Sequence, residues 1–243
     1  MIRKPVHMSF WEKLLNAVTE TATNALSGLV EAIRTVFEGD PETRRKVAFS
    51  VAIIALSAKM AKADGIVTEH EIDAFREIFR FPESEARNVA RLYNLAKQDV
   101  AGYQAYAEKL SGLCSMGGEN CPMLENVLDG LFHIAKADGA IHENEMVFLA
   151  EIASIFRVSE EHFERITARH VHIGGRDPYK VLGVSRQDDF PTIRQHYISL
   201  VREHHPDRLV ARGLPAGFHV IANDRMARFN DAYAAIEREL RAA

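Results

Sequence analysis

Two acidic turns hold the residues of this chain whose types and spacing suit the binding of a hard metal ion. Each turn has the pattern Asp-Gly-x-(Val/Ile)-x-x-x-Glu, which places several carboxylates within eight residues. Carboxylate oxygens suit calcium, magnesium or manganese. The sequence therefore names six candidate metal-ligating residues, which are Asp64, Glu69, Glu71, Asp138, Glu143 and Glu145.

The same turns also fit a purely structural role as hinges between helices. Their pattern is similar to the second half of a calcium-binding EF-hand loop, but Met60 and Lys62 stand where the first half needs oxygen ligands. Gly65 and Gly139 suit the left-handed end of a helix, and Thr68 with Glu71 suits a capping box for the next one. We favour the helix-cap interpretation and keep a divalent-metal site as the alternative hypothesis.

A second group of polar residues, His205-Pro206-Asp207, follows a helical pattern directly. Proline cannot continue a helix, so it holds the histidine and the aspartate at a defined angle beside the helix end. The chain has no nucleophile–base pairing, no phosphate-cradling glycine loop and no His-Glu zinc helix. We therefore predict that the protein is not an enzyme and needs no cofactor.

Helical patterns lie on both sides of the tripeptide. Asp177 to Val184 begins with proline in a first turn, and Phe190 to His204 places Ile193, Tyr197 and Leu200 on one face. A third pattern follows, with apolar residues at Met226, Phe229, Ala232, Tyr233 and Ile236. The rest of the chain shows little strand-like alternation, so the sequence predicts an all-α fold.

These patterns together resemble the J domain, whose first helix carries Asp-x-Tyr-x-x-Leu-Gly-Val and whose second helix leads into His-Pro-Asp. The resemblance implies a co-chaperone that binds a DnaK-type chaperone and stimulates its ATPase. It assigns chaperone contacts to His205, Pro206, Asp207, Arg194, Tyr197, Arg202 and Arg208. Ile198 and Ser199 stand where an Arg-Lys pair is common and Glu203 replaces a frequent lysine, so we expect a less positive docking face and a more selective partner.

The preceding part of the chain contains an internal repeat. Ala61 to Glu71 reappears as Ala135 to Glu145, which predicts a pseudo-symmetric bundle of helices. The doubled Lys-Ala-Asp-Gly is similar to the TerB-like domain of tellurite resistance and stress response. Followed by a J domain, it looks like the bacterial DjlA family of DnaJ-like proteins. The resemblance implies that the TerB-like domain directs location or client; a metal-responsive stress-response interaction protein is the alternative.

Composition narrows the remaining possibilities. The formal net charge is −4, which gives no basis for nucleic-acid binding. Cys114 and Cys121 lack zinc-site spacing, and we interpret them as ordinary thiols in a reducing compartment. Residues 9–37 follow a helical period, and two interpretations stay open, packing on the core or peripheral contact with a membrane. We expect a cytoplasmic protein, or one attached to the cytoplasmic face of the inner membrane.

The patterns predict four successive parts of the chain. Residues 1–40 form the amphipathic helix and residues 41–169 the TerB-like helical domain. Residues 170–176 contain a Gly-Gly joint and form the linker, and residues 177–243 form the J domain. The client and any membrane partner are not identified by the sequence.

Overall fold

The computed structural model describes residues 41–64, 69–78, 86–98, 102–112, 120–171, 177–211 and 218–242. The α helices that run through these ranges, with no strand among them, confirm the predicted all-α fold. The segment 1–40, including the amphipathic pattern at 9–37, lies outside the described residues, so its predicted helix stays a prediction.

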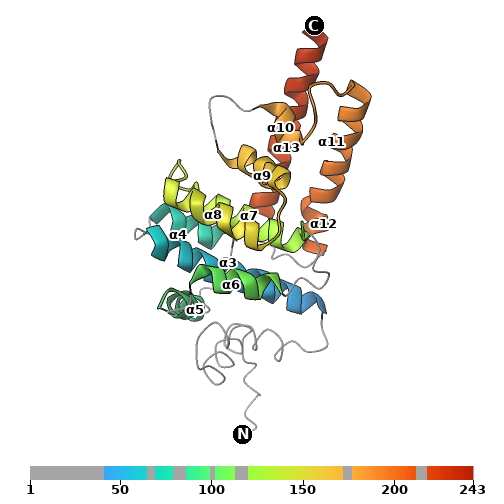
Figure 1. Ribbon diagram of the computed structural model, residues 1–243. Coiled ribbons are helices and arrows are strands. Elements are labelled where there is room, and N and C mark those ends of the chain that lie inside the picture. Colours follow the sequence, from blue (N-terminus) through green and yellow to red (C-terminus); the bar gives the residue numbers. More distant parts are fainter. Residues whose placement is uncertain are drawn as a thin grey trace.

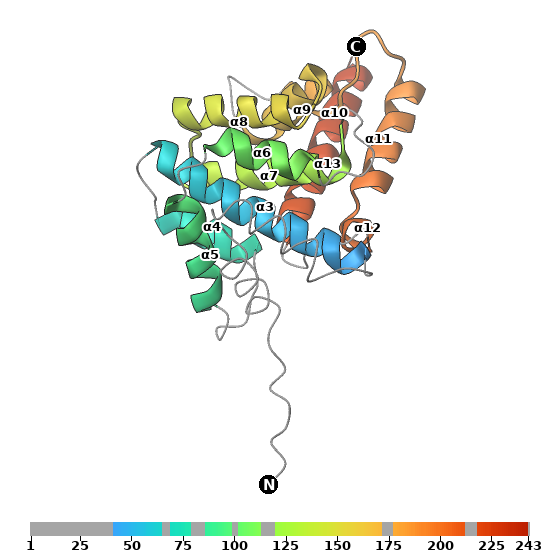
Figure 2. The ribbon, with the colours of Figure 1, turned by 60° about the horizontal axis from the view of Figure 1, so that its bottom comes forward.

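Seven of the described helices form the first part of the fold, which we call the front bundle. They are α3 (Pro41–Asp64), α4 (Glu69–Ile78), α5 (Ala86–Gln98), α6 (Tyr103–Ser111), α7 (Pro122–Ala135), α8 (Glu143–Ile155) and α9 (Glu160–His170). Helix α3 crosses the middle of this bundle and contacts α5, α6, α7 and α8 (Figure 2). A helix that is covered on all sides must be apolar around its whole circumference. Accordingly, every residue from Phe49 to Ala61 is buried, and the ammonium of Lys59 lies 4.7 Å from the ring centroid of Tyr106.

The second acidic turn lies between α7 and α8. Gly139 has a φ of +103°, a backbone conformation that L side chains rarely adopt. Ile141 packs against the core of the front bundle, as a hinge residue should. The described residues of this turn thus match the predicted helix–turn–helix hinge. The first turn, at residues 65–68, lies outside the described residues.

Within residues 177–211 and 218–242, four helices form the second part of the fold, the C-terminal bundle. They are α10 (Pro178–Leu182), α11 (Phe190–His204), α12 (Pro206–Ala211) and α13 (His219–Ala242). Helices α10 and α11 both pack on α13 (Figure 1). Their shared core contains Tyr179, Val181, Leu182, Ile193, Phe229, Ala232 and Ile236. The chain after the tripeptide continues directly as α12, because Pro206 is well placed in the first turn of a new helix.

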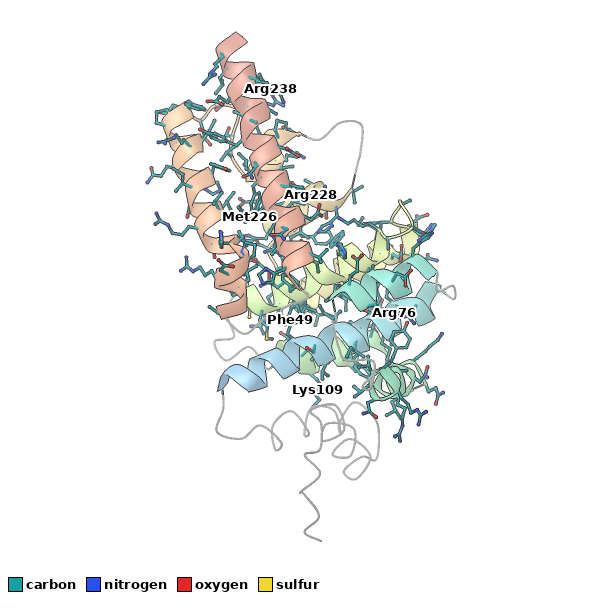
Figure 3. All side chains as sticks on the ribbon, turned by 180° about the vertical axis from the view of Figure 1, so that it is seen from behind. Phe49, Arg76, Lys109, Met226, Arg228 and Arg238 are labelled. Atoms are coloured by element: carbon teal, nitrogen blue, oxygen red, sulfur yellow. The ribbon has the colours of Figure 1, made fainter. Side chains whose placement is uncertain are left out.

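Helix α13 belongs to both bundles. Its upper part completes the C-terminal core, whereas Ile221 and Ala222 at its beginning lie in the core of the front bundle. Phe218, immediately before α13, meets Phe49 of α3 edge to face at 5.2 Å. Figure 3 shows Phe49 below the start of α13, on the side of α3 that faces it. The parts of the chain before and after the predicted linker at residues 170–176 therefore contribute side chains to one apolar core.

Cys121 stands at the N-cap of α7 and is disulfide-bonded. Our interpretation of both cysteines as free thiols is therefore wrong for Cys121. The spacing of the two cysteines in the sequence speaks against a zinc site and says nothing of a disulfide bond. Cys114 lies outside the described residues.

Candidate functional site

The tripeptide His205-Pro206-Asp207 lies at the junction of α11 and α12. His205 caps α11, and Pro206 opens α12 with its ring buried. The side chains on either side of it are open to solvent, with exposed fractions of 51% for His205 and 85% for Asp207. The Asp207 backbone N–H donates to Nδ1 of His205 at 3.3 Å. The turn thus presents an imidazole and a carboxylate that are available to a partner and oriented by their own backbone.

Helix α11 is capped and anchored, so its outer face is presented in a fixed orientation. The Asp189 side chain accepts from the Thr192 backbone N–H at 2.9 Å, and Ile193 is fully buried. Arg194 and Arg202 are exposed on α11. These two guanidinium groups supply positive charge on the same helix that ends at His205.

Two other predicted contact residues have structural partners. The Tyr197 hydroxyl donates to Asn230 of α13 at 2.8 Å, and its ring stacks on Tyr233 with centroids 4.3 Å apart. Arg208 donates to the backbone carbonyl of Arg202 at 3.3 Å, which ties α12 to the last turn of α11. Both residues hold the frame of the exposed turn, and Arg208 remains exposed.

A buried ionic cluster lies directly behind this turn, and sequence reasoning did not find it. Its centre is Asp129 of α7, which is 1% exposed. Asp129 accepts from Arg169 at 3.1 Å, from His170 at 2.8 Å and from Arg225 at 2.6 Å. Arg225, from α13, also donates to Nδ1 of His204 at 2.8 Å. The cluster therefore connects the front bundle to the residue that precedes His205.

The charges of this cluster follow from its contacts. Arg225 and Arg169 hold the pKa of Asp129 well below its usual range and overcome the opposing effect of burial. Burial, followed by the nearby arginines, lowers the pKa of His204 to about 2. Burial also lowers the pKa of His170 to about 4. Asp129 is therefore ionised and both imidazoles are neutral at pH 7, so His204 can accept a hydrogen bond from Arg225.

The two depressed histidine pKa values predict that mild acid destabilises the fold. Unfolded histidines take up protons below about pH 6.5, whereas folded His170 and His204 resist protonation, so stability is lost as the pH falls. Burial raises the pKa of Glu125 to about 7. This group therefore acts in the opposite direction, because its contribution to the free energy of unfolding is lost as the pH rises. We expect the free energy of unfolding to fall by about 1–2 kcal/mol per pH unit between pH 6 and 5.

Urea unfolding at pH 7, 6 and 5 measures this slope. Glu125→Gln should steepen the loss, because the substitution removes the group that opposes it. A free energy of unfolding that stays constant or rises between pH 6 and 5 would show that the two imidazoles are not buried in neutral form.

A cavity of about 240 Å³ lies between the two bundles beside the cluster. It separates α9 of the front bundle from the inner face of α11, and Arg165, His196 and Glu203 are among its lining residues. Nε of Arg169 and Nε2 of His196 find no hydrogen-bond partner among the described residues. Its walls carry both cations and carboxylates, so the cavity does not select for a ligand of one charge.

The acidic side chains of the second turn serve the helix termini. The Glu145 carboxylate accepts from the His142 backbone N–H at 2.9 Å, and Asp138 accepts from the Ala140 backbone N–H at 3.3 Å. Glu143 is exposed. Within the described ranges, no three His, Cys, Asp or Glu side chains gather as a metal site would require. Of Asp64, Glu69 and Glu71 the structure describes the backbone and not the side chains, so the metal hypothesis for them stays a prediction.

Membrane contact also depends on residues that the structure does not describe. None of the helices in the described ranges is both long and apolar enough to span a bilayer. Peripheral contact through residues 9–37 stays a prediction, which fractionation of cells would test.

Comparison with known proteins finds a family model that matches the front bundle. Residues 50–168 match the family model described as tellurite resistance protein TerB. This range extends from within α3 to within α9. It therefore includes Asp129 of α7 but not the exposed tripeptide. No solved structure gives a significant match to the chain.

The full-length comparison extends over both bundles. The chain is 28% identical to Co-chaperone protein DjlA of Photobacterium profundum over 221 residues, covering 80% of this chain and 79% of the relative. It is 26% identical to Co-chaperone protein DjlA of Salmonella typhimurium and 25% identical to that of Escherichia coli K12, each over 82% of both chains. The similarity is distant, and it covers most of the length of each relative.

Proposed function

We propose that this chain, a distant homologue of the DjlA co-chaperones with a TerB domain at residues 50–168, binds a DnaK-type chaperone and stimulates its ATPase. The observation that carries the proposal is the exposed His205-Pro206-Asp207 turn at the end of α11. Helices α10, α11 and α13 then constitute a J domain. Its role is recognition of the chaperone, and it breaks no bond itself.

The proposed mechanism is differential binding. A co-chaperone accelerates hydrolysis only if it binds the hydrolysis-competent state of the chaperone more tightly than the resting state. The His205 imidazole can donate a hydrogen bond through Nε2 and the Asp207 carboxylate can accept one, because each side chain is open to solvent and neither is engaged in the core. Arg194 and Arg202 supply positive charge that steers an acidic surface of the chaperone toward α11.

The docking face has an apolar element as well as charge. Ile198 is 39% exposed on α11, one turn after Arg194 and one turn before Arg202. Glu203 adds a negative charge near the end of the same helix. We infer that this J domain discriminates among DnaK-type chaperones by an apolar contact at Ile198, because its electrostatic attraction is modest. The TerB domain is proposed to direct the location or the client.

Binding to an immobilised DnaK-type chaperone tests the proposal directly. The full chain should bind the ATP-loaded chaperone more tightly than the ADP-loaded one, because the proposed mechanism requires tighter binding to the hydrolysis-competent state. Equal binding in both nucleotide states would contradict differential recognition, and absence of binding in both would contradict the function.

Reversing the charge at Arg202 should weaken this binding in a salt-dependent way. We expect Arg202→Glu to reduce affinity about 10-fold at low ionic strength, with a smaller effect at high salt, because salt screens the interaction between exposed charges. Arg238→Glu is the matched control, since Arg238 is an exposed arginine near the far end of α13 (Figure 3). An equal loss for both variants, or a loss that does not depend on salt, would mean that α11 does not steer docking.

A further inference from the structure

The end of α11 is attached to the TerB domain through Arg225. This side chain is 3% exposed and lies between the two bundles. Its Nε and Nη2 donate to Oδ2 of Asp129 at 3.1 and 2.6 Å, and Nη2 also donates to Asn126 at 2.9 Å. Its Nη1 donates to Nδ1 of His204 at 2.8 Å. A single planar guanidinium thus joins α7 of the TerB domain to the residue immediately before His205.

Burial makes this connection rigid. Asp129 is 1% exposed, so its hydrogen bonds are shielded from bulk solvent. The His204 ring also packs against Phe229 with centroids 5.6 Å apart, so the imidazole is held by both a ring contact and a hydrogen bond. The planar fork of arginine can satisfy a carboxylate and a second acceptor together, which the single ammonium of lysine cannot do in the same geometry.

The other side of the exposed turn is anchored in the TerB domain as well. Leu209, in α12, is 2% exposed and belongs to the same apolar core as α3 and α7. The turn His205-Pro206-Asp207 therefore lies between His204, fixed through Arg225, and Leu209, fixed by packing. Both anchors depend on residues that precede the predicted linker.

We propose that Asp129 and Arg225 are positioning residues for the chaperone-binding turn, so that the TerB domain itself sets the geometry in which His205 and Asp207 meet the chaperone. This inference rests on the proposed function. Its consequence is that the two domains act as one stimulating unit. The TerB domain is then a structural part of the J domain's active surface, in addition to any role in choosing location or client.

Two substitutions in the full chain separate positioning from folding. Asp129→Asn keeps the shape of the side chain and removes the charge that orients Arg225. Arg225→Lys keeps a cation beside Asp129 and removes the simultaneous bond to His204. Arg228→Lys is the matched control on the same helix, because the side-chain hydrogen bonds that the structure describes for Arg228 are to Asp224 of its own helix.

The measurement is the rate of ATP hydrolysis by a DnaK-type chaperone as the concentration of each variant is raised. We expect the maximal stimulation by Asp129→Asn and Arg225→Lys to fall by about 10-fold or more, since small misplacements of contact groups cost up to about 100-fold. The half-saturating concentration should stay within about threefold, because Arg194 and Arg202 are untouched. Arg228→Lys should match the unsubstituted chain.

A variant that only unfolds in part would show the opposite pattern, with a higher half-saturating concentration and an unchanged maximum. Such a pattern, or an unchanged maximum in both variants, would overturn the positioning role.

If the unsubstituted chain does not stimulate hydrolysis at all, the proposed function fails separately. Hydrogen exchange then still tests the attachment. Amides of residues 205–211 should exchange faster in Arg225→Lys than in Arg228→Lys, and equal rates would refute it.

Discussion

The full chain carrying His205→Gln is expected to leave ATP hydrolysis by a DnaK-type chaperone at its basal rate. Half of the His205 side chain is exposed, and its described contacts are with Asp207 two residues away. The substitution therefore changes what the partner meets while leaving the core intact. Losing one contact residue at the centre of an interface costs 2 kcal/mol or more, so we expect stimulation to fall by at least about 30-fold.

The matched control for this substitution is His70→Gln, because His70 is an exposed histidine on α4 of the TerB domain. Both variants should unfold within about 0.5 kcal/mol of the unsubstituted chain, since neither change touches a buried side chain. If His205→Gln still stimulates the chaperone as strongly as His70→Gln, then the exposed turn is not the element that acts on the chaperone.

Phe49→Ala is expected to lower the free energy of unfolding of the whole chain by about 3–5 kcal/mol. The Phe49 ring is 1% exposed and meets Phe218 edge to face at 5.2 Å. Its removal leaves a cavity beside Phe218, at the point where the start of α13 joins the core of the front bundle. Because α13 also forms the core of the C-terminal bundle, the loss should reach both bundles.

Urea unfolding followed by circular dichroism, with hydrogen exchange at α11 and α13, measures this effect. We expect one cooperative unfolding transition that moves to lower urea concentration for both bundles together. Val147→Ala is a suitable control, because Val147 is 59% exposed on α8. Two separate transitions, with α10 and α11 keeping their protection in Phe49→Ala, would show that the bundles fold independently and that the shared core is not cooperative.

The sequence predicted the helices and the exposed turn because both depend on local signals. Helical periodicity and the proline at 206 are properties of a few neighbouring residues, and they give the end of α11 without knowledge of the rest of the fold. Helix α12 was not predicted, and the reason is local too. Proline both ends one helix and suits the first turn of the next, and the pattern did not show which role would dominate.

The buried cluster could not be predicted in the same way, because its members come from α7, α9, α11 and α13. One signal did exist in the sequence. Asp129 follows Val127 and Leu128 in an apolar helix, and a carboxylate there needs a cationic partner from elsewhere in the chain. The partner could not be named, because Arg225 is almost a hundred residues away and looks like one of several surface arginines of a helical pattern.

The most direct test is a single-turnover measurement of ATP hydrolysis by a DnaK-type chaperone as the full, unsubstituted chain is titrated against it. We expect the rate to rise with the concentration of the chain and to saturate, as it must when a specific complex forms. A rate that stays at its basal value at concentrations far above that of the chaperone would contradict the co-chaperone function.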